Sequence, residues 1–286
     1  MIRVNRHRRP AEPMPRRLLI AGCGDLGMRL AARLNTDAWA VTGLRRNASA
    51  LPESMAALSA DLSRPETLRQ LDRDWDAVIY QPTPGQRDES AYRRTYVEGL
   101  SNLLDRVRPR RLIFVSSTAV FGQDEGEWVD EQSETAPSRF NGRLVLEGER
   151  LALAAAAESL VVRFSGIYGP GREYLVDSVR SGRASCRPEP PQWTNRIHAE
   201  DCAAVLEHLL ELNDPESVYC ASDCRPAVRC EVMGWLADRL GASPPQHLDP
   251  GEGGGQGKRV DNHRLLASGF EFQFPDYQHG YGAILS

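Results

Sequence analysis

Three glycines near the start of the chain have a spacing that could bind a phosphate-containing ligand. The stretch AGCGDLG places Gly22, Gly24 and Gly27 in the pattern G-x-G-x-x-G. An apolar run precedes the pattern and a helix-like run follows it, so the glycines would form a strand-to-helix turn. Such a turn brings the amides of a helix N-terminus close to a pyrophosphate. We therefore predict a dinucleotide site that also includes Asp25 and Leu26, with an ordinary glycine-rich turn as the alternative.

The next apolar run, WAVTGLRR, indicates which dinucleotide would bind. It ends in Arg45 and Arg46 and contains no acidic residue. NAD sites usually place Asp or Glu at this position for the ribose 2′-hydroxyl, whereas NADP sites place arginine near the 2′-phosphate. A guanidinium is also the side chain best suited to a phosphate. We predict that the cofactor is NADP, with NAD less favoured. Two solvated surface arginines are the alternative.

Short apolar runs alternate with helix-like segments over residues 17–168. This alternation is typical of parallel strands that are covered by helices on both faces. We predict an α/β fold with a Rossmann-type, doubly wound parallel sheet. The expected strands are RLLIAG (17–22), WAVTGL (39–44), DAVIYQ (76–81), RLIFVSS (111–117) and SLVVRFSGIYG (159–169).

The two ends of the chain differ from this dinucleotide-binding domain. Residues 1–16 are basic and proline-rich without apolar periodicity, which predicts a disordered tail. Residues 169–286 contain more glycine and proline around a few helices. We expect this part to form a smaller substrate-binding region, parts of which return to the sheet.

Composition excludes several classes of protein. Charged residues make up 26% of the chain, and the net charge of −4 gives no reason to expect binding to nucleic acid or to an anionic membrane. No apolar run approaches the ~18 residues of a membrane span, and no secretion signal is evident, so we expect a cytoplasmic protein. The six cysteines are then expected to be reduced thiols, and no metal site is predicted. A zinc site at Cys220, Cys224 and Cys230 is the alternative.

Four further segments identify a family resemblance. They are SADLSRPETL (59–68), RLIFVSSTAVFG (111–122), VVRFSGIYGPG (161–171) and RIHAEDCAAVL (196–206). With the glycine-rich turn, they resemble the extended short-chain dehydrogenase/reductase superfamily, in particular its NAD(P)-dependent epimerase/dehydratase-like proteins, over nearly the whole chain from residue 17. The resemblance implies an oxidoreductase that acts on a small molecule, with nucleotide- or sugar-linked compounds as candidate substrates. A homodimer is a candidate assembly.

The resemblance also implies roles for individual residues. Tyr168 lies in a YGPG turn on the substrate side, and His198 and Asp201 match a His-x-x-Asp pattern that organises a substrate-side helix. For this last pair, a helix cap and a packed histidine are an equally good explanation. The implied cofactor and catalytic positions are Asp61 and Leu62 at the adenine, Gln81 and Pro82 along the cofactor, Ser116, and Ser117 as the catalytic serine.

One expected motif is missing. The family carries Tyr-x-x-x-Lys after its serine strand, where tyrosine transfers a proton and lysine binds the nicotinamide ribose. Here Arg139 and Arg143 occupy the two positions. Arginine does not release a proton near neutral pH, but Arg143 could still donate hydrogen bonds to the ribose and supply positive charge, in contact with the cofactor or the substrate, so it remains both a cofactor-binding and a catalytic candidate. A surface pair between Arg143 and Glu147 is the alternative.

A replacement proton donor would have to come from another part of the chain. Tyr96 and Tyr168 are the candidates, because a lone serine is a poor general acid. Two functions therefore remain open. The first is an NADP-dependent epimerase/dehydratase-like oxidoreductase with a non-standard active site, and we favour it because of the family resemblance. The second is a catalytically inactive NADP-binding redox sensor or regulatory protein, which the missing tyrosine would explain.

Overall fold

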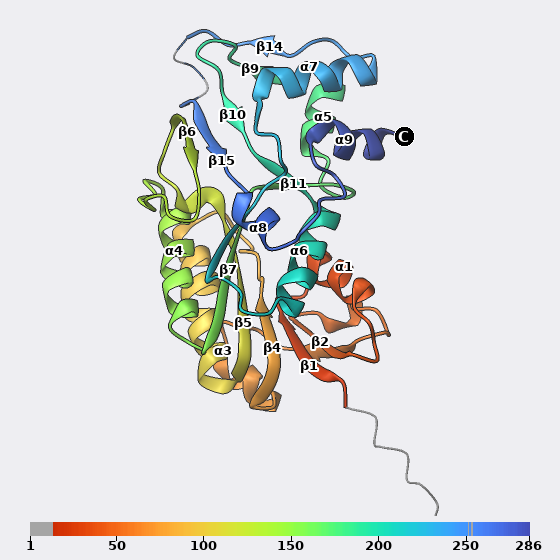
Figure 1. Ribbon diagram of the computed structural model, residues 1–286, viewed down its shortest axis with the longest axis vertical. Coiled ribbons are helices and arrows are strands. Elements are labelled where there is room, and N and C mark those ends of the chain that lie inside the picture. Colours follow the sequence, from red (N-terminus) through yellow and green to blue (C-terminus); the bar gives the residue numbers. More distant parts are fainter. Residues whose placement is uncertain (1–13, 251, 253) are drawn as a thin grey trace, which may run out of the picture.

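A seven-stranded parallel sheet forms the larger part of the protein, in the lower half of Figure 1. The computed structural model describes residues 14–250, 252 and 254–286, so most of the predicted basic tail lies outside the described residues. The strand order is β3-β2-β1-β4-β5-β7-β12, and every neighbouring pair is parallel. The predicted Rossmann-type fold is therefore confirmed. The strands are β1 (Arg16–Ala21), β2 (Trp39–Arg45), β3 (Ala56–Ser59), β4 (Asp74–Tyr80), β5 (Arg108–Ser117), β7 (Glu158–Phe164) and β12 (Val218–Ala221).

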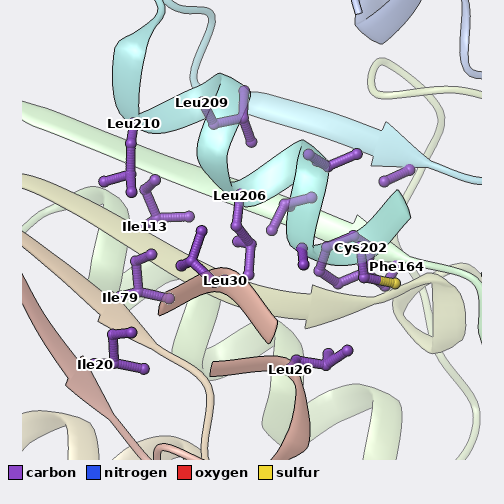
Figure 2. Close-up of a cluster of buried hydrophobic side chains, with 14 of the residues drawn as sticks. Ile20, Leu26, Leu30, Ile79, Ile113, Phe164, Cys202, Leu206, Leu209 and Leu210 are labelled. Carbon is purple, nitrogen blue, oxygen red and sulfur yellow. The ribbon is translucent and has the colours of Figure 1, made fainter. Parts of the chain in front are cut away.

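Helices cover both faces of this sheet. Helices α1 (Asp25–Arg33) and α6 (Ala199–Glu211) pack on one face, and α3 (Gly99–Arg106) and α4 (Phe140–Leu153) pack on the other. Successive strand residues point to opposite faces, so the continuous apolar runs of the strands supply both cores. Figure 2 shows the first core, where isoleucines of β1, β4 and β5 lie opposite leucines of α1 and α6.

The helical segment between β4 and β5 is divided into three parts. It begins as α2 (Glu89–Arg93), widens into a π-helical turn at Arg94–Glu98, and continues as α3. At this turn the Tyr80 hydroxyl donates a hydrogen bond to the Thr95 carbonyl at 2.5 Å. Because π-helical turns are rare and are often found at functional sites, the side chains of Arg94–Glu98 are candidates for the functional site.

Apart from β12 and α6, which belong to the sheet and its covering layer, the C-terminal part (residues 169–286) lies beyond the carboxyl ends of the sheet strands (Figure 1). Its own core joins α5 (Tyr174–Arg180), α7 (Arg229–Leu240) and α9 (Tyr277–Leu285). Within the described part of the chain, no helix is long and apolar enough to cross a membrane. The smaller elements are β6 (Glu125–Val129) with β15 (Gly257–Val260), β8 (Gly166–Tyr168) with β11 (Arg196–His198), β9 (Ser185–Cys186) with β14 (Gln246–His247), β10 (Trp193–Thr194) with β13 (Ala227–Val228), and α8 (His263–Ala267).

The prediction of six reduced cysteines is wrong for two of them. Cys186 in β9 and Cys230 in α7 form a disulfide, with their Cα atoms 5.4 Å apart. The two residues are 44 positions apart in the sequence, and only the packing of α7 against β9 brings them together. Because Cys230 is bonded to Cys186, it cannot serve as a ligand in the alternative zinc site. Cys23, Cys202, Cys220 and Cys224 are free thiols.

Candidate functional site

The glycine-rich turn is built for close backbone approach. Strand β1 ends at Ala21, and Gly22 then adopts a φ of +81°, where a side chain would come within 2.5 Å of the Pro82 backbone. A side chain at Gly27 would overlap the Gln81 amide. Gly24 is the N-cap of α1 and has no side chain that could accept a hydrogen bond from the first amides of the helix. These amides therefore remain available to a ligand.

A cavity of about 760 Å³ opens beside this turn. It brings together the predicted adenosine-side residues from the ends of β1, β2, β3 and β4. The predicted residues that line it are Gly22, Gly24, Arg45, Arg46, Asp61, Leu62 and Pro82, joined by Asn47, Ser63 and Arg94, which the sequence argument did not name.

Positive charge is concentrated at the β2 side of this first cavity. Among the described residues, the guanidinium groups of Arg45 and Arg46 form no hydrogen bond or ion pair with a carboxylate. The Asp61 carboxylate instead accepts hydrogen bonds from the Ser63 amide at 3.0 Å and the Ser63 hydroxyl at 2.8 Å. Burial raises the pKa of Asp61, but these hydrogen bonds and the charge of Arg46 outweigh it and hold the pKa below its usual range. The carboxylate therefore stays ionised within its own turn.

A second cavity, of about 330 Å³, lies at the carboxyl ends of β4, β5 and β7. Gly22, Gly24, Pro82 and Thr83 line both cavities, so the two meet at the glycine-rich turn. The predicted residues that line the second cavity are Gly22, Gly24, Asp25, Leu26, Gln81, Pro82, Tyr96, Ser116 and Ser117.

Tyr96 is the tyrosine of this second cavity. The π-helical turn carries it, and its ring packs 6.2 Å from Phe114 and 5.6 Å from Tyr92. Within the described residues its hydroxyl has no hydrogen-bond partner. Burial, with a smaller effect from Tyr92, raises the Tyr96 pKa well above its ordinary value, so the phenol stays protonated near neutral pH. Tyr96 could therefore donate a proton.

Tyr168 lies outside both cavities. Its side chain is 4% exposed and packs against the rings of Tyr281 at 4.4 Å and His198 at 5.3 Å. Its buried hydroxyl has no partner in the described structure, and burial raises its pKa. Of the two tyrosines considered as proton donors, only Tyr96 lies beside Ser117 in the cavity lining.

The two arginines that replace Tyr-x-x-x-Lys also lie outside the lining of both cavities. Arg139 is the N-cap of α4, and the Arg143 guanidinium donates a hydrogen bond to the Ser138 carbonyl at 2.5 Å. The alternative Arg143–Glu147 pair is not formed, because Glu147 pairs with Arg93 at 3.3 Å. Arg143 would have to leave Ser138 before it could reach a bound cofactor.

His198 and Asp201 support the fold around the substrate-side helix. The Nδ1 atom of His198 accepts the Glu200 amide at 3.3 Å and so caps α6. Asp201 accepts the amides of Gln273 and Phe274 at 2.8 and 3.0 Å. The helix-cap explanation therefore describes His198, whereas Asp201 fixes the chain at Gln273 and Phe274.

A buried ion pair next to the second cavity was not predicted from the sequence. Glu149 of α4 accepts two hydrogen bonds from Arg163 of β7, at 3.0 and 2.8 Å, and a third from the Ser116 hydroxyl at 2.5 Å. The side chains of Arg163 and Glu149 are only 6% and 2% exposed. This network joins the helix to the end of β5. An arginine inside the apolar run VVRF was the available signal.

Arg172 is a second functional candidate that the sequence argument missed. It follows the YGPG turn and lines the second cavity. Its Nε lies 3.3 Å from the Asp25 carboxylate at the start of α1. The signal in the sequence was a basic residue directly after GPG, which was treated only as part of a turn motif.

The fold and the two cavities define an NAD(P)-dependent epimerase/dehydratase-like protein of the extended short-chain dehydrogenase/reductase superfamily, and the chain belongs to this family. A family model described as the RmlD substrate binding domain matches residues 16–185. A protein from Methylobacillus flagellatus, whose structure is described as an NAD-dependent epimerase/dehydratase, is 39% identical with a TM-score of 0.79. The match covers 94% of this chain and 97% of that one.

Two curated relatives are more distant. Protein YeeZ of Escherichia coli strain K12 is 29% identical over 274 residues, which cover 91% of this chain and 97% of the relative. A 3-diazoavenalumate denitrifying reductase of a Streptomyces species is 27% identical over 260 residues, covering 81% and 84% respectively. The predicted family is confirmed.

Proposed function

We propose that the protein binds NADP across the two cavities and reduces the carbonyl group of a small molecule. The observation that carries this proposal is the arginine pair at the end of β2, whose guanidinium groups line the first cavity without a carboxylate partner among the described residues. A 2′-phosphate would provide that partner. The adenine would lie near Asp61 and Leu62, and the diphosphate at the N-terminus of α1.

The shape of the turn fits such a cofactor. A side chain at Gly22 or Gly27 would overlap neighbouring residues, whereas a side chain at Gly24 would meet nothing closer than 3.9 Å. The room at Gly24 leaves space where the diphosphate would approach. The buried Gln81 Oε1 in the second cavity also has no partner within the described structure. A nicotinamide amide could donate to that oxygen.

The chemistry would use few protein groups. The bound cofactor would supply a hydride to the carbonyl carbon. Tyr96 would donate its phenolic proton to the carbonyl oxygen, which Ser117 would help to orient. The carbonyl would thereby become an alcohol and the reduced cofactor NADPH would become NADP⁺, while Tyr96 would regain its proton from solvent. Arg143 would hold the nicotinamide ribose only if it left Ser138. The name of the Streptomyces relative, a reductase, supports the reductive direction.

Cofactor titration tests this proposal. We expect NADPH to bind at least about tenfold more tightly than NADH, because a charge-assisted phosphate contact contributes ~1.5–3 kcal/mol. The double variant Arg45→Ala/Arg46→Ala should remove this preference and leave NADH affinity unchanged. Arg108→Met is the matched control, because Arg108 is the first residue of β5 and lies at the end of the sheet away from the cavities. This variant should keep the preference for NADPH. Equal affinity of the unaltered protein for NADPH and NADH would refute the assignment.

A second candidate function is an NADP-binding redox sensor. The observation that favours it is the position of Arg139 and Arg143 outside the cavities. The raised Tyr96 pKa also favours it, because it makes the protonated phenol a weaker acid. A panel of aldehydes and ketones separates the two functions. Tight NADPH binding without oxidation by any member of the panel would favour the sensor. The proposal places either activity in the cytoplasm, because NADPH is produced and used inside cells.

A further inference from the structure

Arg172 is the one cationic side chain among the described residues that line the second cavity. The only other charged residue in that lining is Asp25, and most of the remaining lining is apolar or carries hydroxyl groups. The first cavity, by contrast, has Arg45, Arg46 and Arg94. The catalytic end of the site therefore has a single positive group with which to attract an anion.

The turn that carries Arg172 is fixed by its own backbone and by α1. Gly169 and Gly171 adopt φ values of +140° and +80°, and the Arg172 amide donates to the Gly169 carbonyl at 2.8 Å. From α1, Arg29 donates to the Pro170 carbonyl at 3.2 Å. Because the backbone is held at these points, the Arg172 side chain starts from a defined position at the rim of the cavity.

The guanidinium of Arg172 has unused hydrogen-bonding capacity. Its Nε contacts Asp25 Oδ2 at 3.3 Å, but the other oxygen of Asp25 already accepts the Arg29 Nε at 3.0 Å. Within the described structure, neither Nη nitrogen of Arg172 has a partner. The side chain is 38% exposed, so a ligand can reach it. The N–H groups of the two Nη nitrogens, which lie in one plane, match the two oxygens of a carboxylate or a phosphate.

We propose that Arg172 binds the anionic group, a carboxylate or a phosphate, of the carbonyl substrate and thereby selects acidic substrates. This inference rests on the proposed function, because it assumes that the second cavity holds the reacting carbonyl. Tyr96 and Ser117 line the same cavity and would take the carbonyl end, while Arg172 takes the acidic end. A neutral carbonyl compound would gain no such contact, because both Nη nitrogens of Arg172 would stay without a partner among the described residues and only the Nε–Asp25 contact would remain.

The position of Arg172 favours the substrate over the cofactor as the source of this anion. The amides at the start of α1 already provide a diphosphate site. Arg172 follows β8, a strand that pairs with β11 of the C-terminal part rather than with the central sheet. It therefore belongs structurally to the region that covers the site, where a substrate would enter.

Titration calorimetry on the full chain, saturated with oxidised NADP, tests the assignment. The probes are carboxybenzaldehyde, its uncharged methyl ester, and inorganic phosphate as a competitor. We expect the acid to bind about tenfold or more tightly than the ester, with phosphate displacing it. Arg172→Gln should abolish this difference, and Arg172→Lys should restore part of it. Arg180→Gln is the matched control, because Arg180 pairs with Asp177 on the exposed side of α5.

Each other outcome has a defined meaning. Equal binding of acid and ester, binding of neither, or a preference that survives in Arg172→Gln would overturn the proposal. A large loss of NADP affinity in Arg172→Gln would assign the residue to the cofactor diphosphate and would also overturn it. NADP affinity is measured first and separately. A failure to bind NADP therefore refutes the proposed function, which can be distinguished from a failure of Arg172 to bind an anion.

Discussion

At the scale of single residues, the proposed site combines a serine at the position that the family resemblance implies with Tyr96 as the proposed acid. Ser117 lies where the family resemblance places the catalytic serine, and Tyr96 lines the same cavity from a π-helical turn. No lysine assists Tyr96, since the single lysine of the chain, Lys258, donates to the Phe121 carbonyl at 2.8 Å. The proton donor of this site is therefore expected to be weaker than that of a Tyr-Lys pair.

Substitution of Tyr96 tests this donor. Tyr96→Phe should lower kcat for carbonyl reduction by ~10²–10⁴-fold while NADPH affinity stays within about twofold. Tyr92→Phe, one helical turn earlier, is the matched control and should be nearly neutral. Because the Tyr96 pKa is raised, the unaltered protein should keep its proposed proton donor at pH ~10, where an ordinary tyrosine is half ionised. Steady-state rates across pH provide the measurement, and an unchanged rate in Tyr96→Phe would exclude the residue.

At the scale of elements, the buried Glu149–Arg163 pair fastens α4 to the sheet. Glu149→Ala would leave the Arg163 charge buried without a partner, so we expect the free energy of unfolding to fall by ~3–5 kcal/mol. Glu147→Ala is the matched control, because it removes only an exposed pair worth ~0–1 kcal/mol. Urea denaturation measures both.

A double variant adds a second test of this network. Glu149→Leu/Arg163→Met replaces both charges by apolar side chains and should recover most of the lost stability. If the single and double variants were equally unstable, packing rather than an uncompensated charge would be the cause. The Ser116 hydroxyl would lose its acceptor in each variant.

The elements also show what the sequence could and could not predict. The strands and the glycine-rich turn were predictable, because apolar periodicity and glycine spacing are local properties of the chain. The π-helical turn was not, since the segment 90–108 has ordinary helical periodicity and the turn depends on contacts such as Tyr80 to Thr95. Arg172 was visible as a residue, but the sequence does not show that Asp25 is shared between Arg29 and the Arg172 Nε, which leaves the Arg172 Nη nitrogens without a partner in the described structure.

At the scale of the whole molecule, the disulfide joins parts of the chain that the sequence keeps far apart. It ties β9 to α7 within the C-terminal core. No local sequence pattern predicts such a pairing, because the spacing of cysteines does not determine which of them form a disulfide. The expectation of reduced thiols followed from the predicted compartment and failed for Cys186 and Cys230 because it took no account of three-dimensional proximity.

Removal of the bridge should destabilise the fold. For a loop closed over 44 positions, the chain-entropy relation gives about 4 kcal/mol for Cys186→Ser/Cys230→Ser. Dithiothreitol should lower the stability of the unaltered protein towards that of the variant and should have no effect on the variant itself. The control is Cys224→Ser, which removes an exposed free thiol. Stability that is insensitive to both the reductant and the substitution would argue against the bridge.

Strand β12 and helix α6 lie late in the chain, yet β12 pairs with β7 and α6 packs against α1, the helix that starts at the glycine-rich turn. A growing chain that ended near residue 170 would expose the edge of β7 and leave one face of the first core uncovered. During synthesis, the sheet and the first core of the nucleotide-binding half are therefore expected to be completed only after the segment up to residue 221 has been made. The two halves would then fold as one cooperative unit, although only one of them carries the glycine-rich turn.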